Sequence, residues 1–221
     1  PGGSGFQSVH TTQNPEDSSM RRLLLLAIAV LLVSAMPALA QISGTAHDLR
    51  GTIGGSQICV ACHTPHGATP AVPLWNHSLP SPANTYNVYT GSATIQATDL
   101  SDFSSADGSI SSLCLSCHDG TTALGSVIND PGDLTDTTST LLGPANLGTD
   151  LTNDHPVNFT FGAALIAADG ELQAPTNAIL FGVGADQVEC ASCHNVHDNT
   201  NSPFLVTSNA ASALCLDCHT K

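Results

Sequence analysis

The stretch Cys59-Val60-Ala61-Cys62-His63-Thr64-Pro65-His66 begins with a C-x-x-C-H unit. The same unit recurs at residues 114–118, 190–194 and 215–219. All 8 cysteines of the 221-residue chain belong to these four units, so none is left over. A pattern that uses every cysteine and places a histidine after every second one indicates one chemistry repeated four times.

That chemistry is covalent haem binding, because C-x-x-C-H is the attachment signature of c-type haem. Two thiols three positions apart on one helical turn reach the two vinyl groups of a porphyrin, and the next residue then directs its imidazole at the iron. The sequence predicts four haem c groups. The attachment residues are Cys59, Cys62, Cys114, Cys117, Cys190, Cys193, Cys215 and Cys218, and the proximal iron ligands are His63, His118, His194 and His219.

Two other interpretations of the cysteines compete with haem. Exported cysteine-rich chains often form disulfides, but disulfides do not explain the histidine after every second cysteine. Zinc sites also use C-x-x-C pairs, but four Cys-Cys-His units would leave each site short of a ligand or force the sites to share one. Haem accounts for both features of the pattern.

An export signal precedes the first motif. Met20-Arg21-Arg22 begins a basic segment, an apolar run covers residues 23–33, and Ala38-Leu39-Ala40 supplies an A-x-A cleavage site. Eleven apolar residues are too few for an ordinary membrane span, so we expect a signal peptide over residues 20–40. Residues 1–19 are then interpreted as the product of an over-extended reading frame. Residues 41–221 are expected to form the tetrahaem domain, without a membrane span.

This expected mature chain is strongly acidic. Its 181 residues keep only Arg50 and Lys221 as basic side chains against sixteen Asp and Glu, which gives a net charge of −14. A chain without a basic surface does not bind nucleic acid, and an anionic membrane surface is disfavoured for the same reason. Solvated carboxylates are favoured over calcium sites, although the sequence leaves calcium binding open.

Five further histidines compete for the distal side of the four irons. The expected mature chain contains no methionine, so bis-histidine, six-coordinate haems are predicted. His66 and His197 each lie three residues after a proximal histidine and cannot fold back over their own haem, but they can reach a neighbouring one. The other candidates are His155, His77 and His47. Because five candidates meet four irons, one is predicted to be spare, most readily His47 or His77.

The segments between the motifs are rich in Gly, Pro, Ser, Thr, Asn and Asp, which favours turns over long helices. We expect an irregular, loop-rich fold with few short helices, at 111–118 and 210–219, and a small β element. In that element, the alternating Val157, Phe159 and Phe161 predict a strand that pairs with 178–183 across a turn near Asp169-Gly170. A second short strand is expected near Tyr86 and Tyr89. The haems must form most of the core.

The residues within and around the motifs resemble those of a known family. The stretch 59–66, Pro73-Leu74-Trp75-Asn76-His77, residues 113–120 and His155-Pro156-Val157 are similar to the OmcE-type extracellular tetrahaem cytochromes, the cytochrome nanowires. The resemblance implies bis-histidine haems in a continuous chain and a conductive filament. It also implies a homopolymer in which the adjacent subunit supplies one distal histidine, for which His47 and His66 are candidates.

The predicted function is therefore extracellular electron transfer to redox partner proteins or extracellular acceptors, by an electron carrier and not an enzyme. A monomeric periplasmic shuttle with the same four haems is the main alternative. A multihaem reductase for small nitrogen or sulfur compounds would need an iron with an open position, and five candidate histidines for four irons argue against that. A disulfide-stapled surface binder is the non-redox alternative.

Overall fold

The computed structural model of the protein describes residues 41–68, 72, 74–81, 84–95 and 109–221, which all belong to one unit, Ala40–Lys221. The predicted signal peptide and the segment before it lie outside the described residues, as does Pro73. None of the helices in the described part is long and apolar enough to cross a membrane.

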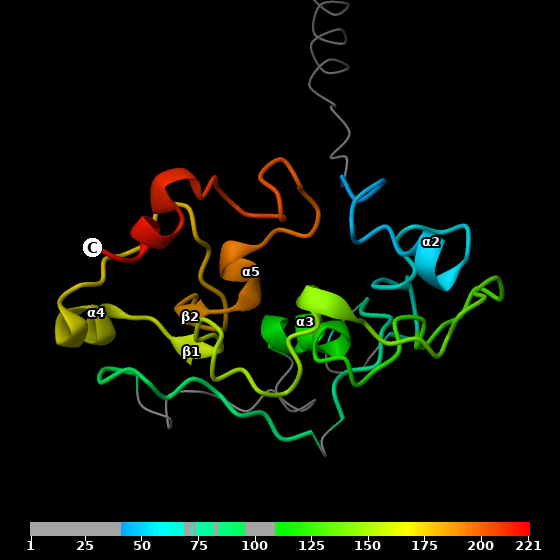
Figure 1. The fold of residues 1–221 in the computed structure, drawn as a ribbon, viewed down its shortest axis with the longest axis horizontal. Coiled ribbons are helices and arrows are strands. Elements are labelled where there is room, and N and C mark those ends of the chain that lie inside the picture. The colour runs from blue at the N-terminus through cyan, green and yellow to red at the C-terminus, as the bar shows by residue number, and fades with distance from the viewer. Residues whose placement is uncertain (1–40, 69–71, 73, 82–83, 96–108) are drawn as a thin grey trace, which may run out of the picture. The chain divides into compact units, whose positions relative to one another are not determined.

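Loops connect a few short elements (Figure 1). The α-helices are α2 (Arg50–Ile53), α3 (Ile110–His118), α4 (Ala163–Asp169) and α5 (Cys190–Cys193), and the strands are β1 (Phe159–Thr160) and β2 (Gln187–Val188). Single 3-10 turns occupy Gly143–Ala145, Ala210–Ser212 and Cys215–Asp217. The predicted irregular, loop-rich architecture is thus confirmed.

Helix α3 is nine residues long and carries the second motif. Ser109 caps its start, because the Ser109 side chain accepts from the backbone N–H of Ser112, a bond that satisfies one of the free donors of the first turn. The buried face of α3 consists of Leu115 and three serines. Small side chains allow close approach, and this face packs against α5, which carries the third motif.

The β element differs from the predicted one. Strand β1 pairs antiparallel with β2, in the register Phe159 to Val188 and Thr160 to Gln187, and not with residues 178–183. The latter segment pairs with the sheet at one bridge, between Phe181 and Gln187, and its Leu180 packs against the apolar cluster of the sheet. The alternation of apolar residues therefore located the first strand correctly and its partner wrongly.

The turn predicted near Asp169-Gly170 is in fact the end of a helix. Residues 163–169 read AALIAAD, a run dominated by strong helix formers, and they form α4. Gly170 ends the helix in the left-handed conformation, with φ 74°. The strand expected near Tyr86 and Tyr89 is reduced to one parallel bridge between Asn87 and Asp150.

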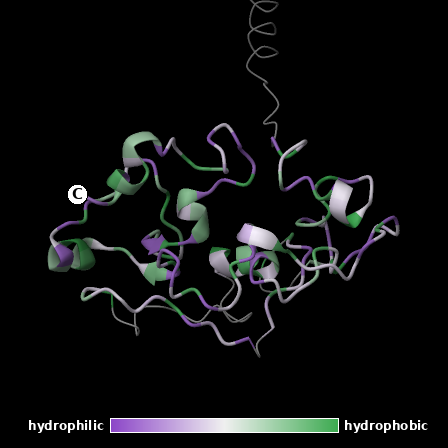
Figure 2. Cartoon of the chain, viewed as in Figure 1, coloured by the Kyte–Doolittle hydropathy of each residue, from purple (hydrophilic) through white to green (hydrophobic). Residues whose placement is uncertain are grey.

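Side-chain packing is divided among three small clusters. They are centred on Ile53, Ala61 and Leu124, on Leu115 and Leu151, and on Phe159, Phe161 and Val188. Figure 2 shows hydrophobic and hydrophilic residues mixed along the connecting loops. In the described part no single cluster is large enough to act as the core of the unit, which fits the expectation that porphyrins fill the space between the clusters.

Candidate haem-binding sites

Each C-x-x-C-H unit forms one tight turn. The second unit lies in α3, the third forms α5, and the fourth includes the 3-10 turn Cys215–Asp217. In three units the histidine N–H donates to the carbonyl of the first cysteine: His63 to Cys59 at 2.8 Å, His194 to Cys190 at 3.1 Å and His219 to Cys215 at 3.0 Å. A turn closed in this way brings residues three apart onto one side, as attachment of both thiols to one porphyrin requires.

All eight cysteines lie in the described part and all are free thiols, so the disulfide interpretation finds no bond to support it. Burial, and next to it the charge of Cys59, raises the pKa of Cys62 to about 11. Burial also raises the pKa of Cys218 to about 11. Among the described residues, no group of three or more His, Cys, Asp or Glu is arranged to hold a bare metal ion such as zinc.

The thiols of successive motifs are neighbours. Burial, and then the charge of Cys62, raises the pKa of Cys117 to about 12. The Cys114 thiol donates to the Cys190 sulfur, which raises the pKa of Cys114 and lowers that of Cys190.

Burial, followed by the charges of Cys190 and Cys215, raises the pKa of Cys193. Thiols of successive motifs thus influence one another in pairs: Cys62 and Cys117, Cys114 and Cys190, and Cys193 and Cys215.

Three motif histidines face a second imidazole. The ring centroids are 6.0 Å apart for His63 and His197, which are stacked at 17°. They are 6.1 Å apart for His118 and His47, inclined at 54°, and 6.3 Å for His219 and His155, inclined at 78°. At 6.0 Å the nearly parallel rings of His63 and His197 are too far apart for face-to-face contact.

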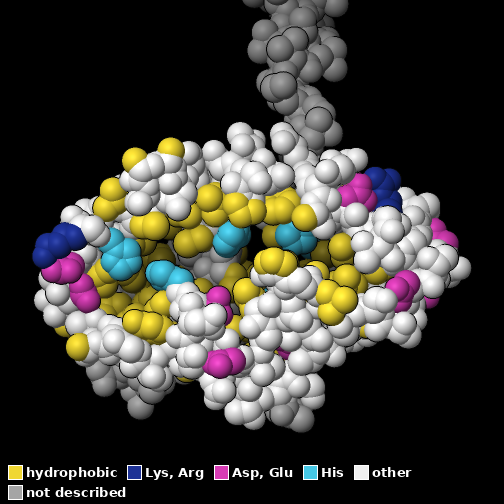
Figure 3. Space-filling model, viewed as in Figure 1, with side chains coloured by type: hydrophobic (Ala, Val, Ile, Leu, Met, Phe, Trp, Pro, Cys, Tyr) yellow, Lys and Arg dark blue, Asp and Glu magenta, His cyan; other side chains and the backbone are white. Residues whose placement is uncertain are grey.

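Two imidazoles that bind one metal ion from opposite sides, each through a nitrogen at about 2 Å, have centroids about 6 Å apart. The three separations therefore fit bis-histidine haem iron. Figure 3 shows histidines lining hollows whose walls are largely hydrophobic, as a porphyrin requires.

Hydrogen bonds set the orientation of several rings. Nδ1 of His118 lies 2.7 Å from the Ala145 carbonyl oxygen, and Nδ1 of His194 lies 3.0 Å from that of Pro203. A carbonyl only accepts, so each Nδ1 donates, and in the neutral ring Nε2 keeps the lone pair that a metal needs. His155 is held in the same way by the Pro156 carbonyl at 2.8 Å.

His47 is the most enclosed of the three partner rings. Burial, followed by the positive charges of His118, His194 and His197, lowers the pKa of His47, so its neutral form is favoured. An iron ligand must be neutral. The Phe204 ring stands edge-on to His47, with centroids 4.6 Å apart.

His77 differs from the other candidates because it is fully buried. Its Nε2 lies 2.9 Å from the Ala123 carbonyl oxygen and 3.6 Å from the Cys117 sulfur, and its Nδ1 lies 3.0 Å from the Ser78 carbonyl oxygen. Both ring nitrogens thus face protein atoms, which gives His77 the surroundings of a structural histidine.

Two histidines remain, the predicted proximal ligand His194 and the distal candidate His66. Within the described residues, no second histidine ring faces His194 at the separation of the three pairs. His66 is exposed, and the backbone of its turn is braced by Asn129, whose side-chain amide donates to the carbonyls of His66 at 3.1 Å and Gly67 at 3.0 Å. Asn129 is itself held through its N–H by Asn76 Oδ1, at 2.9 Å.

The acidic residues were predicted to be solvated, but three carboxylates are buried. Asp119 accepts from Tyr86 Oη at 2.6 Å, and Asp217 accepts from Thr176 Oγ1 at 2.7 Å. Glu189 is buried at the start of α5. Each of them lies within a haem motif or directly beside one, and this position was the signal that could have singled them out.

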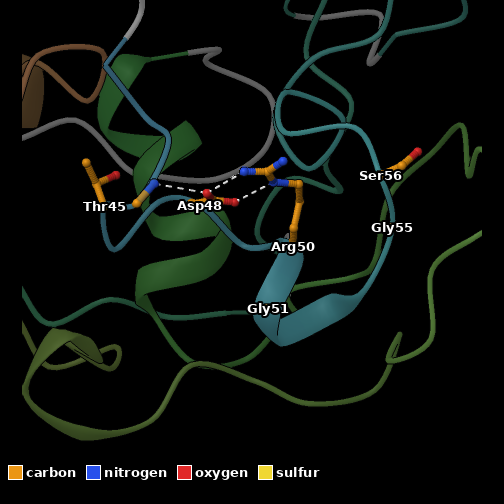
Figure 4. A pocket seen from close by; sticks show the side chains of 7 residues that line it. Thr45, Asp48, Arg50, Gly51, Gly55 and Ser56 are labelled. Carbon is orange, nitrogen blue, oxygen red and sulfur yellow. Dashed lines mark hydrogen bonds and ion pairs between the residues drawn. The ribbon is translucent and has the colours of Figure 1, made fainter.

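One open pocket lies near the start of the described chain (Figure 4). Its volume is about 690 Å³, and its lining includes Arg50, whose guanidinium donates to the Asp48 carboxylate at 2.7 and 2.8 Å. These hydrogen bonds hold the pKa of Asp48 below its usual range. The charge of Arg50 is already paired within the pocket, and the remaining lining is Gly44, Thr45, Gly51, Gly55 and Ser56.

Residues 183–221 match the family model described as the doubled CXXCH motif. This segment contains the third and fourth attachment units. No curated protein matches the chain. A doubled C-x-x-C-H motif is the attachment signature of covalently bound haem c and indicates a multihaem c-type cytochrome.

Proposed function

We propose that the chain binds four haem c groups, one at each motif, and works as an exported electron carrier that polymerises into a conductive filament. The observation that carries the proposal is the set of three histidine pairs with centroids 6.0 to 6.3 Å apart, the separation expected for two ligands of one iron. When bound, haem supplies one-electron exchange between Fe(III) and Fe(II).

Under this proposal each distal ligand comes from a segment outside the motif whose haem it binds. His197, which follows the third motif, serves the first haem opposite His63, and His47 serves the second opposite His118. His155 serves the fourth opposite His219. His77, whose ring nitrogens face protein atoms, is the spare.

The sequential contacts between the attachment thiols support transport along the chain. Cys62 and Cys117 pack against the same apolar cluster, Cys114 donates to Cys190, and the charge of Cys193 contributes to the raised pKa of Cys218. The protein would thus hold four haem sites in sequence order, with the first and fourth at the ends. Covalent attachment retains the haems outside the cell.

The third motif supports assembly between subunits. Its His194 has no partner ring among the described residues, while His66 is exposed and its turn is braced by Asn129. We assign His66 of a neighbouring copy as the distal ligand of the haem on Cys190 and Cys193. This assignment agrees with the resemblance to the filament-forming cytochromes, in which one ligand comes from the adjacent subunit.

The test compares H66A with H155A in the holoprotein, after intact mass has shown four haems. In isolated monomers, H155A is expected to add one high-spin haem by electron paramagnetic resonance, because His155 acts within its own subunit. H66A is expected to leave the monomer spectrum unchanged. On concentration, wild type is expected to form filaments in negative-stain images and to lose its high-spin signal, whereas H66A stays monomeric.

Three outcomes reject parts of this proposal. If wild-type protein stays monomeric under all conditions, the filament is rejected and the periplasmic shuttle remains. Filaments of H66A that match wild type reject His66 as the ligand in trans. A high-spin haem that persists in assembled protein and binds nitrite or sulfite supports the reductase, because the His194 iron would then have an open position.

A further inference from the structure

Glu189 is a buried carboxylate between two haem motifs. Its side chain is 2% exposed, although glutamate is rarely buried without partners, and it directly precedes Cys190. Its carboxylate accepts from the backbone N–H of Ser192, while its own N–H donates to Ser192 Oγ at 2.9 Å. This reciprocal pair fixes the carboxylate at the start of α5.

The same carboxylate also binds α3. Glu189 Oε2 accepts from the N–H of Ser111 at 3.1 Å and from the Ser111 hydroxyl. Ser111 Oγ in turn accepts from the N–H of Cys190 at 3.1 Å. Ser111 is fully buried, so these bonds form a closed network between the helix of the second motif and that of the third.

The charge of Glu189 acts on both attachment sites. The hydrogen bond to Cys190, then burial, raises the pKa of Cys114, and the charges of Cys190 and Glu189 add to that rise. Glu189 also acts to raise the pKa of Cys190, although the hydrogen bond from Cys114 dominates and lowers it. The carboxylate is thus an electrostatic neighbour of one sulfur on each helix.

We propose that Glu189 is a potential-tuning residue, a fixed anion that lowers the reduction potentials of the haems carried by α3 and α5. The inference rests on the proposed function only in requiring haem at these two motifs; it does not require filaments. Oxidised haem iron carries one more positive charge than reduced iron, so a nearby anion stabilises the oxidised form. Because the carboxylate is buried, solvent screens it little.

The network keeps the anion in place. Three donors, the Ser111 N–H, the Ser111 hydroxyl and the Ser192 N–H, point at the carboxylate and stabilise its ionised form. Both basic side chains of the described residues pair elsewhere, Lys221 with Glu171 and Arg50 with Asp48. The three donors named here are neutral groups that hold the carboxylate in place without cancelling its charge.

The experiment removes the charge and measures the reduction of each haem separately. In E189Q holoprotein, exchange NMR of the haem methyl groups during a redox titration should show that the haems on Cys114/Cys117 and Cys190/Cys193 become easier to reduce. The other two haems should change less. Because Ser is a good N-cap, E189S removes the same charge while it can still cap α5, and it gives the test if E189Q fails to fold.

Two matched controls separate charge from structure. S111A removes the two hydrogen bonds of the Ser111 hydroxyl but keeps the anion, and it should move the potentials much less than E189Q. E171Q removes an exposed carboxylate that pairs with Lys221, and it should move none of them. Equal shifts in S111A and E189Q, unchanged potentials in E189Q and E189S, or equal shifts of all four haems would overturn the inference. A chain without haem at these motifs would instead reject the proposed function.

Discussion

At the scale of single residues, the attachment chemistry could be predicted from sequence and the buried carboxylates could not. A C-x-x-C-H unit fixes the role of three residues through local spacing alone. Whether Asp217 or Glu189 is solvated depends on segments about 40 and 78 positions away along the chain, which supply Thr176 and Ser111. No local pattern contains that information.

The Asp217 carboxylate gives a test at this scale. It is 6% exposed and accepts from the N–H groups of Asn177 at 2.9 Å and Ala178 at 2.7 Å, besides Thr176. D217N replaces an acceptor oxygen by a donor amide that faces other donors. We expect the free energy of unfolding of the holoprotein to fall by about 1–3 kcal/mol in urea titrations. D130N, at an exposed loop carboxylate, is the control and should change it by less than about 0.5 kcal/mol.

A partly exposed aspartate gives a prediction about pH. Hydrogen bonds from the Ser139 side chain, and then from the N–H groups of Thr138 and Ser139, lower the pKa of Asp136 from 3.8 to about 2. The folded state therefore binds this proton less readily than the unfolded state, so the stabilisation is complete above about pH 4 and is lost as the pH falls toward 2. NMR titration of the Asp136 carboxyl carbon should give a midpoint near 2 in the folded protein, and a midpoint near 4 would contradict the assignment.

At the scale of elements, local propensity predicts a helix or strand correctly where one segment alone determines its structure. The helix predicted over 111–118 is α3, because its serine cap and the motif it carries are local features. Strand pairing failed because β1 had two candidate partners and the choice depends on long-range contacts. The helix formers in 163–169 then left no room for the expected turn.

Helix α3 depends on one large side chain. Leu115 is 1% exposed and packs with Leu151, while the rest of its buried face is serine. Truncation in L115A should lower the free energy of unfolding by about 2–5 kcal/mol, measured by far-UV circular dichroism in denaturant. L142A, at a leucine that is 79% exposed, should leave stability nearly unchanged. Similar losses in the two variants would show that α3 is not held by this contact.

At the scale of the whole molecule, the sequence predicted that the haems form most of the core, because the chain has only 1 Trp, 2 Tyr and 6 Phe. The described residues form small apolar clusters separated by loops, with histidines in the hollows (Figure 3). The pairing of histidines from different motifs could not be predicted, because it requires the three-dimensional path of the loops. The sequence did narrow the choice to five candidates for four positions.

Removal of haem tests this view of the core. A chain whose eight cysteines are all replaced by alanine cannot attach haem covalently. Since too little apolar surface then remains to be buried, we expect a largely unfolded protein without a cooperative thermal transition. Circular dichroism and the dispersion of amide proton NMR signals measure this directly. A cooperative transition in the haem-free chain would show that the protein forms its core without the porphyrins.

The paired histidines also have a consequence for the topology of the chain. An iron bound by His63 and His197 would close a loop of 134 residues, and the other two pairs would close loops of 71 and 64 residues. Such links restrict the unfolded chain as disulfides do, and in the chain-entropy model the effect grows with the length of the loop. Gln41 adds a backbone hydrogen bond to His197 at 2.8 Å, which brings the start of the described chain to the same junction. The iron–histidine bonds would therefore act as reversible cross-links, and the first haem site would be complete only after nearly the whole chain has been exported.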